Sequence, residues 1–335
     1  MASIVYPDLA KKATLSDGTT YGYVSVPASA GKPTFLLLHG YPSTSHDWRH
    51  QIAFLQKEGY GVIAPDLLGY GDTDKPTDLK AYRLKAMSQH VIEILDRENV
   101  SRAVLVAHDW GVGLASRAAF YYPQRFYGFV SIAVAYSAPG KFDLDALLKY
   151  TESLFGYPVF GYWLWHNTDE AADEMAAHPQ SAFNLIYPQD PATWKTDLAP
   201  IGKAAEWVRS GKTTPLPSWL TQEDYDIHQR LFSEGGYAGP LSWYKAAIRG
   251  LNNEDEAGIP EGGNKCTVKN LFIAAKQDYV CRADVGSHST SKNTTDSRVE
   301  VVDAGHWVQL EKPDAVNELL VQFAAEVVKT PSGLL

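Results

Sequence analysis

The sequence predicts a doubly wound α/β fold with a mostly parallel sheet, interrupted by an inserted helical domain. Short strand-like runs recur along the chain, and several are continuously apolar, as expected of strands buried on both faces. Amphipathic segments separate them, and this alternation indicates parallel strands joined by helices. From about 139 to 251 the strand pattern is replaced by helical and loop segments that hold six of the nine tryptophans. We therefore expect a core made of 1–138 and 252–335, with a helical cap at 139–251.

The expected elements follow in order along the chain. An antiparallel lead-in comes first, at Lys12–Leu15 and Thr20–Val26, with Asp17-Gly18 as the turn between its strands. The parallel strands are expected at Thr34–Leu38, Gly61–Ala64, Ala103–Ala107, Gly128–Val134, Asn270–Ala275 and Arg298–Val302. Helices are expected near His46–Glu58, Leu84–Asp96 and Gly113–Tyr122.

Composition narrows the class of protein. The chain of 335 residues has a net charge of −9 and no cluster of basic residues, which argues against nucleic acid as a binding partner. Two cysteines, Cys266 and Cys281, make no disulfide framework, and we expect both to be buried and inert. No His/Cys spacing suggests zinc, so no metal and no cofactor are expected. The N-terminus lacks the basic and apolar regions of a signal peptide, and no apolar run is long enough to span a membrane. We expect a cytoplasmic protein, and an oligomer is possible.

The most informative motif is Ala107-His108-Asp109-Trp110-Gly111, which stands between an apolar strand and a helical pattern. This is the strand-turn-helix of a nucleophile elbow, with Asp109 at the position of the nucleophile. The turn is so sharp that Ala107 and Gly111 must be small. The alternative role for Asp109 is a simple cap on the following helix.

An aspartate nucleophile restricts the chemistry. A carboxylate that attacks an ester or amide carbonyl forms a high-energy anhydride. A carboxylate that attacks a saturated carbon forms an ordinary ester, which water can cleave. Asp109 therefore indicates covalent catalysis on an alkyl electrophile such as an epoxide or an alkyl halide.

Hydrolysis of that ester needs a general base that activates water, and we expect this base in a loop that follows one of the later strands. His306 follows the strand at Arg298–Val302, and Asp278 follows the strand at Asn270–Ala275. The order nucleophile, acid, histidine is the one described for hydrolases with a nucleophile elbow. We expect Asp278 to orient the imidazole and His306 to take a proton from water. Asp303 is the alternative acid and is disfavoured because it is too close in sequence to His306.

Hydrolysis of the ester also needs an oxyanion hole. His39-Gly40-Tyr41-Pro42 follows the strand at Thr34–Leu38, and we assign one donor to the backbone N–H of Tyr41. The second donor is the N–H of Trp110, the residue after the nucleophile. The sequence leaves open whether Pro42 follows a cis bond.

From Asp17 to Phe323 the chain resembles the soluble epoxide hydrolases of the α/β-hydrolase superfamily. The resemblance is carried by the nucleophile elbow at Ala107–Gly111 and by the segment His39-Gly40-Tyr41-Pro42. Three further segments also match: Pro65-Asp66-Leu67-Leu68-Gly69-Tyr70-Gly71, Gly239-Pro240-Leu241-Ser242-Trp243-Tyr244 and Gly305-His306-Trp307. It implies the α/β-hydrolase fold and the opening of an epoxide to a vicinal diol. Haloalkane dehalogenases share the nucleophile, acid and base, and are the first alternative. A non-catalytic binding protein of the same fold is the second.

The resemblance assigns two cap tyrosines, Tyr162 and Tyr244, to the epoxide oxygen. An alkoxide leaves poorly unless an acid assists it, and a tyrosine hydroxyl can do so at neutral pH, whereas a halide needs no proton. Around Tyr162 the chain departs from the family, which often has Asp before this Tyr and Gln after it. Tyr41 stands where many dehalogenases have Asn for the halide. The expected substrate is a small lipophilic epoxide, and the aromatic residues expected to line its pocket are Trp110, Trp163, Trp243 and Trp307.

Overall fold

The computed structural model describes residues 2–260 and 262–328, and its centre is one sheet of eight strands. The strand order is β1-β2-β4-β3-β5-β6-β7-β8. The first two strands are antiparallel, β2 pairs antiparallel with β4, and all later pairs are parallel. The strands are β1 (Ala10–Thr14), β2 (Thr20–Val26), β3 (Thr34–Leu38), β4 (Gly61–Pro65), β5 (Ala103–His108), β6 (Phe126–Ile132), β7 (Asn270–Ala275) and β8 (Ser297–Val302).

The predicted fold class is confirmed, with small shifts at the ends of elements. The strand expected to run to Val134 ends at Ile132, where the backbone turns and Ala133 takes a φ of +61°. The lead-in strand expected at Lys12–Leu15 lies at Ala10–Thr14.

Alternate side chains of the central strands belong to two separate cores. In β5, Ala103, Leu105 and Ala107 pack with the apolar side chains of α3 (Leu84–Arg97) and α4 (Trp110–Tyr121). Val104 and Val106 point to the other face, against α2 (Arg49–Lys57) and α15 (Pro313–Val327). Every residue of β5 is buried, which explains why its sequence is continuously apolar.

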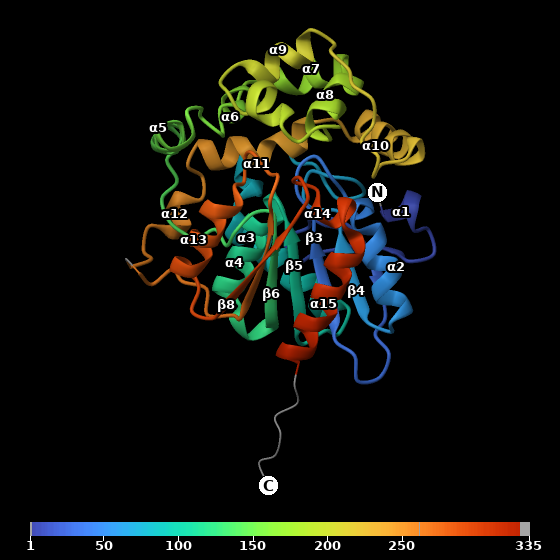
Figure 1. The fold of residues 1–335 in the computed structure, drawn as a ribbon. Coiled ribbons are helices and arrows are strands. Elements are labelled where there is room, and N and C mark those ends of the chain that lie inside the picture. The colour runs from blue at the N-terminus through green and yellow to red at the C-terminus, as the bar shows by residue number, and fades with distance from the viewer. Residues whose placement is uncertain (1, 261, 329–335) are drawn as a thin grey trace.

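A helical layer, residues 144–248, lies over one end of the sheet (Figure 1). It contains α5 (Leu144–Phe155), α6 (Tyr162–His166), α7 (Ala171–Ala177), α8 (Pro179–Ile186), α9 (Lys203–Arg209), α10 (Gln222–Gly235) and α11 (Ala238–Ile248). This is the segment that the sequence predicts as a cap, and the chain re-enters the sheet at β7. The remaining α-helices are α1 (Ala2–Val5), α12 (Asn253–Glu256), α13 (Ala283–Asn293) and α14 (Val308–Glu311). Within the described ranges, no helix is both long and apolar enough to cross a membrane.

Candidate active site

Asp109 lies at the tip of a sharp turn between β5, which ends at His108, and α4, which begins at Trp110. Its backbone has a φ of +50° and a ψ of −125°, a strained conformation for a residue with a side chain. The turn is packed tightly enough to require glycine at Gly111, because a Cβ there would lie 2.4 Å from the carbonyl oxygens of Leu38 and His39. The predicted elbow is therefore present.

Gly40 is required for a different reason: it lies directly against the carboxylate of Asp109. A Cβ on Gly40 would lie 2.3 Å from Asp109 Oδ1 and 2.7 Å from the Trp110 nitrogen. The loop after β3 can thus bring its backbone up to the tip of the elbow only where it carries no side chain.

Replacing Gly40 with Ala is expected to displace this loop or the Asp109 side chain. We expect turnover to fall sharply and stability to decrease by about 1–3 kcal/mol, the usual cost of overpacking. Gly258→Ala is the matched control, because a Cβ at Gly258 has no neighbour within 4 Å. Denaturant unfolding and steady-state turnover measure both effects. Equal stability and turnover in the two variants would show that the close approach has no consequence.

His306 and Asp278 approach Asp109 from the loops after β8 and β7. His306 Nδ1 lies 2.6 Å from Asp278 Oδ2, and His306 Nε2 lies 3.5 Å from Asp109 Oδ2. The other oxygen of Asp278 accepts hydrogen bonds from the amides of Val280 and Cys281, both at 2.8 Å. The structure thus brings all three predicted residues together, and two backbone amides fix the orientation of the Asp278 carboxylate.

The alternative acid, Asp303, points away from this group. Its side chain is 65% exposed and lies 3.6 Å from the Lys276 ammonium. Gln277 also donates to its carboxylate. Asp303 therefore belongs to the surface.

The charges in this group stabilise each other. Burial alone would lower the pKa of His306, but the carboxylates of Asp278 and Asp109 outweigh it and raise that pKa to about 10. Burial would raise the pKa of Asp109, yet its contact with His306 keeps that pKa below its ordinary value. In the resting protein Asp109 is an ionised carboxylate facing an imidazolium, so the nucleophile is in its reactive form.

The N–H of Tyr41 donates to Asp109 Oδ1 at 2.7 Å. The amide of Trp110 opens α4 beside the same carboxylate, and the first N–H groups of a helix have no partner within it. Both predicted oxyanion donors thus lie next to Asp109. The Tyr41–Pro42 bond is cis, which answers the question that the sequence left open.

A chain of hydrogen bonds holds the Tyr41 amide. The amide of Leu67 donates to His39 Nε2 at 2.9 Å, so the ring proton of this neutral histidine is on Nδ1. Nδ1 in turn lies 2.9 Å from the carbonyl oxygen of Gly40 and donates to it. That carbonyl belongs to the same peptide unit as the Tyr41 N–H. His39 therefore orients and polarises the oxyanion donor.

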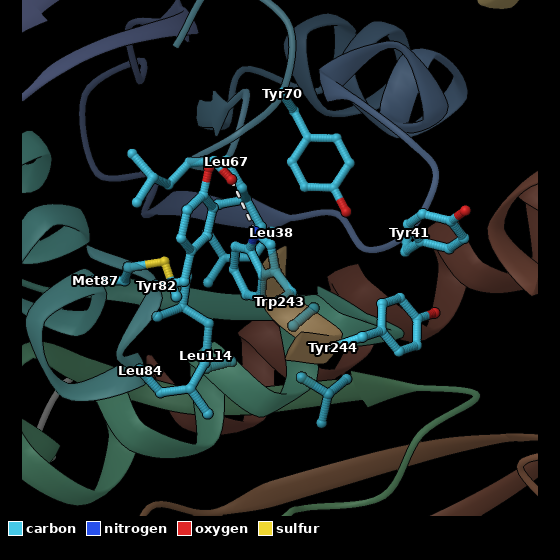
Figure 2. Packing of buried hydrophobic residues seen from close by; sticks show 14 of the residues in the cluster. Leu38, Tyr41, Leu67, Tyr70, Tyr82, Leu84, Met87, Leu114, Trp243 and Tyr244 are labelled. Atoms are coloured by element: carbon cyan, nitrogen blue, oxygen red, sulfur yellow. Dashed lines mark hydrogen bonds between the residues drawn. The ribbon is translucent and has the colours of Figure 1, made fainter. Parts of the chain in front are cut away.

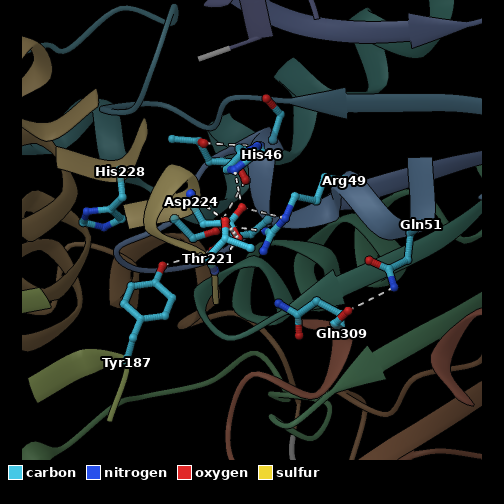
Figure 3. A network of polar contacts seen from close by, with 12 residues as sticks. His46, Arg49, Gln51, Tyr187, Thr221, Asp224, His228 and Gln309 are labelled. Atoms are coloured by element: carbon cyan, nitrogen blue, oxygen red, sulfur yellow. Dashed lines mark hydrogen bonds and ion pairs between the residues drawn. The ribbon is translucent and has the colours of Figure 1, made fainter. Parts of the chain in front are cut away.

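Polar side chains of the helical layer also contact the loop that follows β3, and Figure 3 shows two of them, Tyr187 and His228. The carbonyl oxygen of Pro42 lies 3.1 Å from both the Tyr187 hydroxyl and His228 Nε2. Next to them, Asp224 of α10 pairs with Arg49 Nε at 2.9 Å and His46 Nε2 at 3.2 Å. Polar contacts therefore tie the helical layer to the loop that carries the Tyr41 amide.

Tyr162 and Tyr244 come from α6 and α11 and face the same cavity as Asp109 and His306. Their ring centroids are 6.1 Å apart, and Tyr244 packs edge-on against Tyr41 (Figure 2). Burial, mainly, raises the pKa of both hydroxyls well above the ordinary value. Both tyrosines are therefore neutral donors at physiological pH.

The cavity lies between Asp109 and His306 of the core and the two tyrosines of the helical layer. Its apolar wall is formed by residues that the sequence did not single out: Ile186, Trp194, Leu198 and Val280. Cys281 also borders it and is only partly buried, so the expectation of a buried residue was wrong for Cys281. Cys266 is buried, as expected.

The four tryptophans predicted to contact substrate lie outside the lining of this cavity. Trp110 and Trp163 pack against Tyr244 with ring centroids at 5.0 and 5.2 Å. The indoles of Trp243 and Trp307 donate to the carbonyl oxygens of Leu68 and Ile186, respectively. The structure thus places these rings behind the site, where they support the tyrosines and join the helical layer to the core.

Residues 33–313 match the family model described as alpha/beta hydrolase fold. Epoxide hydrolase A of Mycobacterium tuberculosis is 30% identical over 88% of this chain and 90% of its own length. Bifunctional epoxide hydrolase 2 of Mus musculus is 27% identical over 93% of this chain. The chain spans just over half the length of the mouse, pig and rat relatives.

Solved structures that are similar to this chain include epoxide hydrolases as well. Epoxide hydrolase A from Mycobacterium thermoresistibile is 27% identical, with a TM-score of 0.78 over 94% of this chain and 98% of that one. An epoxide hydrolase from an endophytic Streptomyces is 26% identical, with a TM-score of 0.80 over 94% of each chain. The chain belongs to the α/β-hydrolase family and, within it, to the epoxide hydrolases.

Proposed function

We propose that this protein opens small lipophilic epoxides to vicinal diols through a covalent ester on Asp109. The observation that carries the proposal is one cavity lined by a carboxylate on a nucleophile elbow, by a histidine that is paired with a buried aspartate, and by two neutral tyrosines. The relatives named epoxide hydrolase support it. We also propose residues 139–251 as the cap domain that supplies both tyrosines.

In the first step the hydroxyls of Tyr162 and Tyr244 donate to the epoxide oxygen. Asp109 attacks one ring carbon, and a new C–O bond forms as the ring C–O bond breaks. The oxygen that leaves takes a proton from a tyrosine, so the product is a hydroxyalkyl ester. Esterification removes the negative charge of Asp109, so the imidazolium of His306 loses the carboxylate that stabilised it and gives up its proton. The tyrosinate regains a proton, which leaves a neutral His306 and two neutral tyrosines beside the ester.

In the second step water cleaves the ester. His306 accepts a proton from water, and the hydroxide attacks the carbonyl carbon of Asp109. The negative charge that develops on the carbonyl oxygen is met by the N–H groups of Tyr41 and Trp110. The ester C–O bond breaks, the leaving oxygen takes the proton of the attacking hydroxide, and the neutral diol leaves. Asp109 is restored as a carboxylate with one oxygen from water, and His306 is again an imidazolium. The reaction uses no cofactor.

The proposal separates the pH dependence of the two steps. The pKa of Asp109 is lowered below 3.8, the ordinary pKa of an aspartate. The rate of attack on the epoxide therefore stays constant as the pH falls toward 3.8. Hydrolysis needs unprotonated His306, so its rate rises with pH through the pKa of His306 in the ester. That pKa lies below the value of about 10 in the resting protein, because the ester has lost the charge of Asp109. Rapid-quench measurement of each step against pH tests this, and a hydrolysis rate independent of pH would contradict it.

A haloalkane dehalogenase remains the alternative, and the two tyrosine hydroxyls favour epoxide chemistry over it. Incubation with styrene oxide and, separately, with a bromoalkane distinguishes the two reactions. We expect diol from the first and no bromide from the second. Bromide without diol would identify a dehalogenase, and neither product would indicate a binding protein. The cytoplasmic location, the absence of nucleic-acid partners and an oligomeric state stay predictions.

A further inference from the structure

The loops that hold the His–Asp pair also hold a thiol. Cys281 follows Asp278 by three residues, and its N–H donates to Asp278 Oδ1 at 2.8 Å. One ligand atom each from Asp278, Cys281 and His306 lie within 4.8 Å of one another. The reaction proposed above uses no thiol, so Cys281 has no assigned role.

We propose that Asp278, Cys281 and His306 form an inhibitory binding site for Zn²⁺ or another thiophilic divalent cation. Thiolate, imidazole and carboxylate are the ligands that zinc takes in proteins, and three protein ligands plus water complete a tetrahedral shell. Cys281 and His306 both border the cavity, so an ion can reach them by the route that substrate uses. The sequence did not reveal this set because its members come from two separate loops.

The fit requires a small movement. Zinc bonds of about 2.0–2.2 Å to nitrogen and oxygen place those two atoms roughly 3.4 Å apart in a tetrahedral shell. His306 Nδ1 and Asp278 Oδ2 are 2.6 Å apart, so this pair must open by about 0.8 Å. The amides of Val280 and Cys281 hold only the other oxygen of Asp278, which leaves Oδ2 able to bind the ion.

Binding at this site disables His306 as a base. The ion replaces the proton on Nδ1, and a second proton leaves the thiol of Cys281. The remaining ring proton stays on Nε2, which then has no lone pair with which to accept a proton from water. Asp109 is not a ligand, so its attack on an epoxide continues. This consequence rests on the proposed function: the ion arrests the reaction at the ester.

Direct binding is tested first, without substrate. Cd²⁺ titrated into the metal-free protein is expected to give the ultraviolet charge-transfer absorption of a Cd–thiolate bond. Cys281→Ser and Cys281→Ala remove that thiol, and Cys266→Ser removes the other one as the matched control. We expect the absorption to persist in Cys266→Ser and to vanish in both Cys281 variants, with Zn²⁺ affinity in calorimetry weakened there by more than about 10-fold. Thermal unfolding verifies that each variant is folded.

Inhibition is then measured with Zn²⁺, and each variant is compared with its own metal-free rate. The wild-type protein mixed with Zn²⁺ and styrene oxide should gain the mass of one substrate molecule, whereas the Cys281 variants should keep turning over. Equal inhibition of the Cys281 variants, or no Cd–thiolate absorption in the wild type, would overturn the site. Inhibition by Zn²⁺ without ester in the mass spectrum would overturn the proposed arrest. If the metal-free protein makes no diol, the proposed function fails, and the Cd²⁺ titration still decides whether the site exists.

Discussion

His306→Gln protein mixed with an epoxide gains the mass of one substrate molecule and releases almost no diol. The carboxylate of Asp109 attacks carbon without help from a base, whereas water needs His306 to take its proton. His306 Nε2 lies 3.5 Å from Asp109, close enough to serve a water molecule at the ester carbonyl. Loss of a general base slows a step by about 10²–10⁴-fold, so the ester accumulates. Intact-protein mass spectrometry and a diol assay measure the two outcomes.

The matched control for this variant is His288→Gln, which changes an exposed histidine of α13. It should turn over like the wild type and show no added mass in the steady state. An unmodified His306→Gln protein, under conditions where substrate binding is verified, would contradict the division of labour between Asp109 and His306.

The double change of Tyr162 and Tyr244 to Phe is expected to remove most of the rate of the first step. Phe keeps both rings and their packing, and takes away only the hydroxyls that assist the leaving oxygen. Acid assistance contributes about 10²–10⁴-fold, and either single variant should retain part of it through the remaining hydroxyl. Single-turnover formation of the ester, measured for both single variants and the double variant, gives the comparison.

Tyr150→Phe is the control, because the Tyr150 side chain in α5 is 56% exposed and lies on the surface. Its rate of ester formation should equal that of the wild type. A double variant of Tyr162 and Tyr244 that forms ester at the wild-type rate would remove these residues from the mechanism. It would also favour the haloalkane alternative, in which the leaving group needs no proton.

Much of the fold and of the site could be predicted from the sequence, because both depend on the order of elements along the sheet. Buried parallel strands are continuously apolar, so β3, β5 and β7 could be placed to within a residue at each end. Residues that directly follow such strands meet at one edge of the sheet. Asp109 and Asp278 follow strands of this kind, and His306 follows the half-exposed edge strand β8. The order of the elements along the chain was therefore enough to group the three residues.

The wall of the cavity could not be predicted in this way. Ile186, Trp194 and Leu198 belong to the helical layer, where six tryptophans occur among short helices without a regular repeat. Which of these side chains faces Asp109 depends on how each short helix docks, and local sequence does not determine that. The tryptophans were predicted to line the pocket because aromatic side chains suit a lipophilic substrate, yet the indole nitrogens of Trp243 and Trp307 are used for buried hydrogen bonds.

The contacts behind the oxyanion donor were also missed, for a related reason. His39 reads as part of a turn after a strand, and its role depends on the distant amide of Leu67 and on the neighbouring Gly40 carbonyl. Tyr187 and His228 reach Pro42 across about 145 and 186 residues of chain, respectively. Such partners are set by tertiary packing, and a single sequence carries no signal for them.

The central claim is that Asp109 forms the covalent intermediate, and a single turnover in ¹⁸O-labelled water tests it most directly. With enzyme in excess over epoxide, water attacks the carbonyl carbon of the ester, so the label enters the Asp109 carboxylate. The first diol then carries only the oxygen of the epoxide and an unlabelled oxygen from Asp109. Mass spectrometry of the peptide that contains Asp109, and of the diol, is expected to show label in the peptide and none in the diol. Label in the single-turnover diol would mean that water attacks the epoxide itself, and would contradict the covalent mechanism.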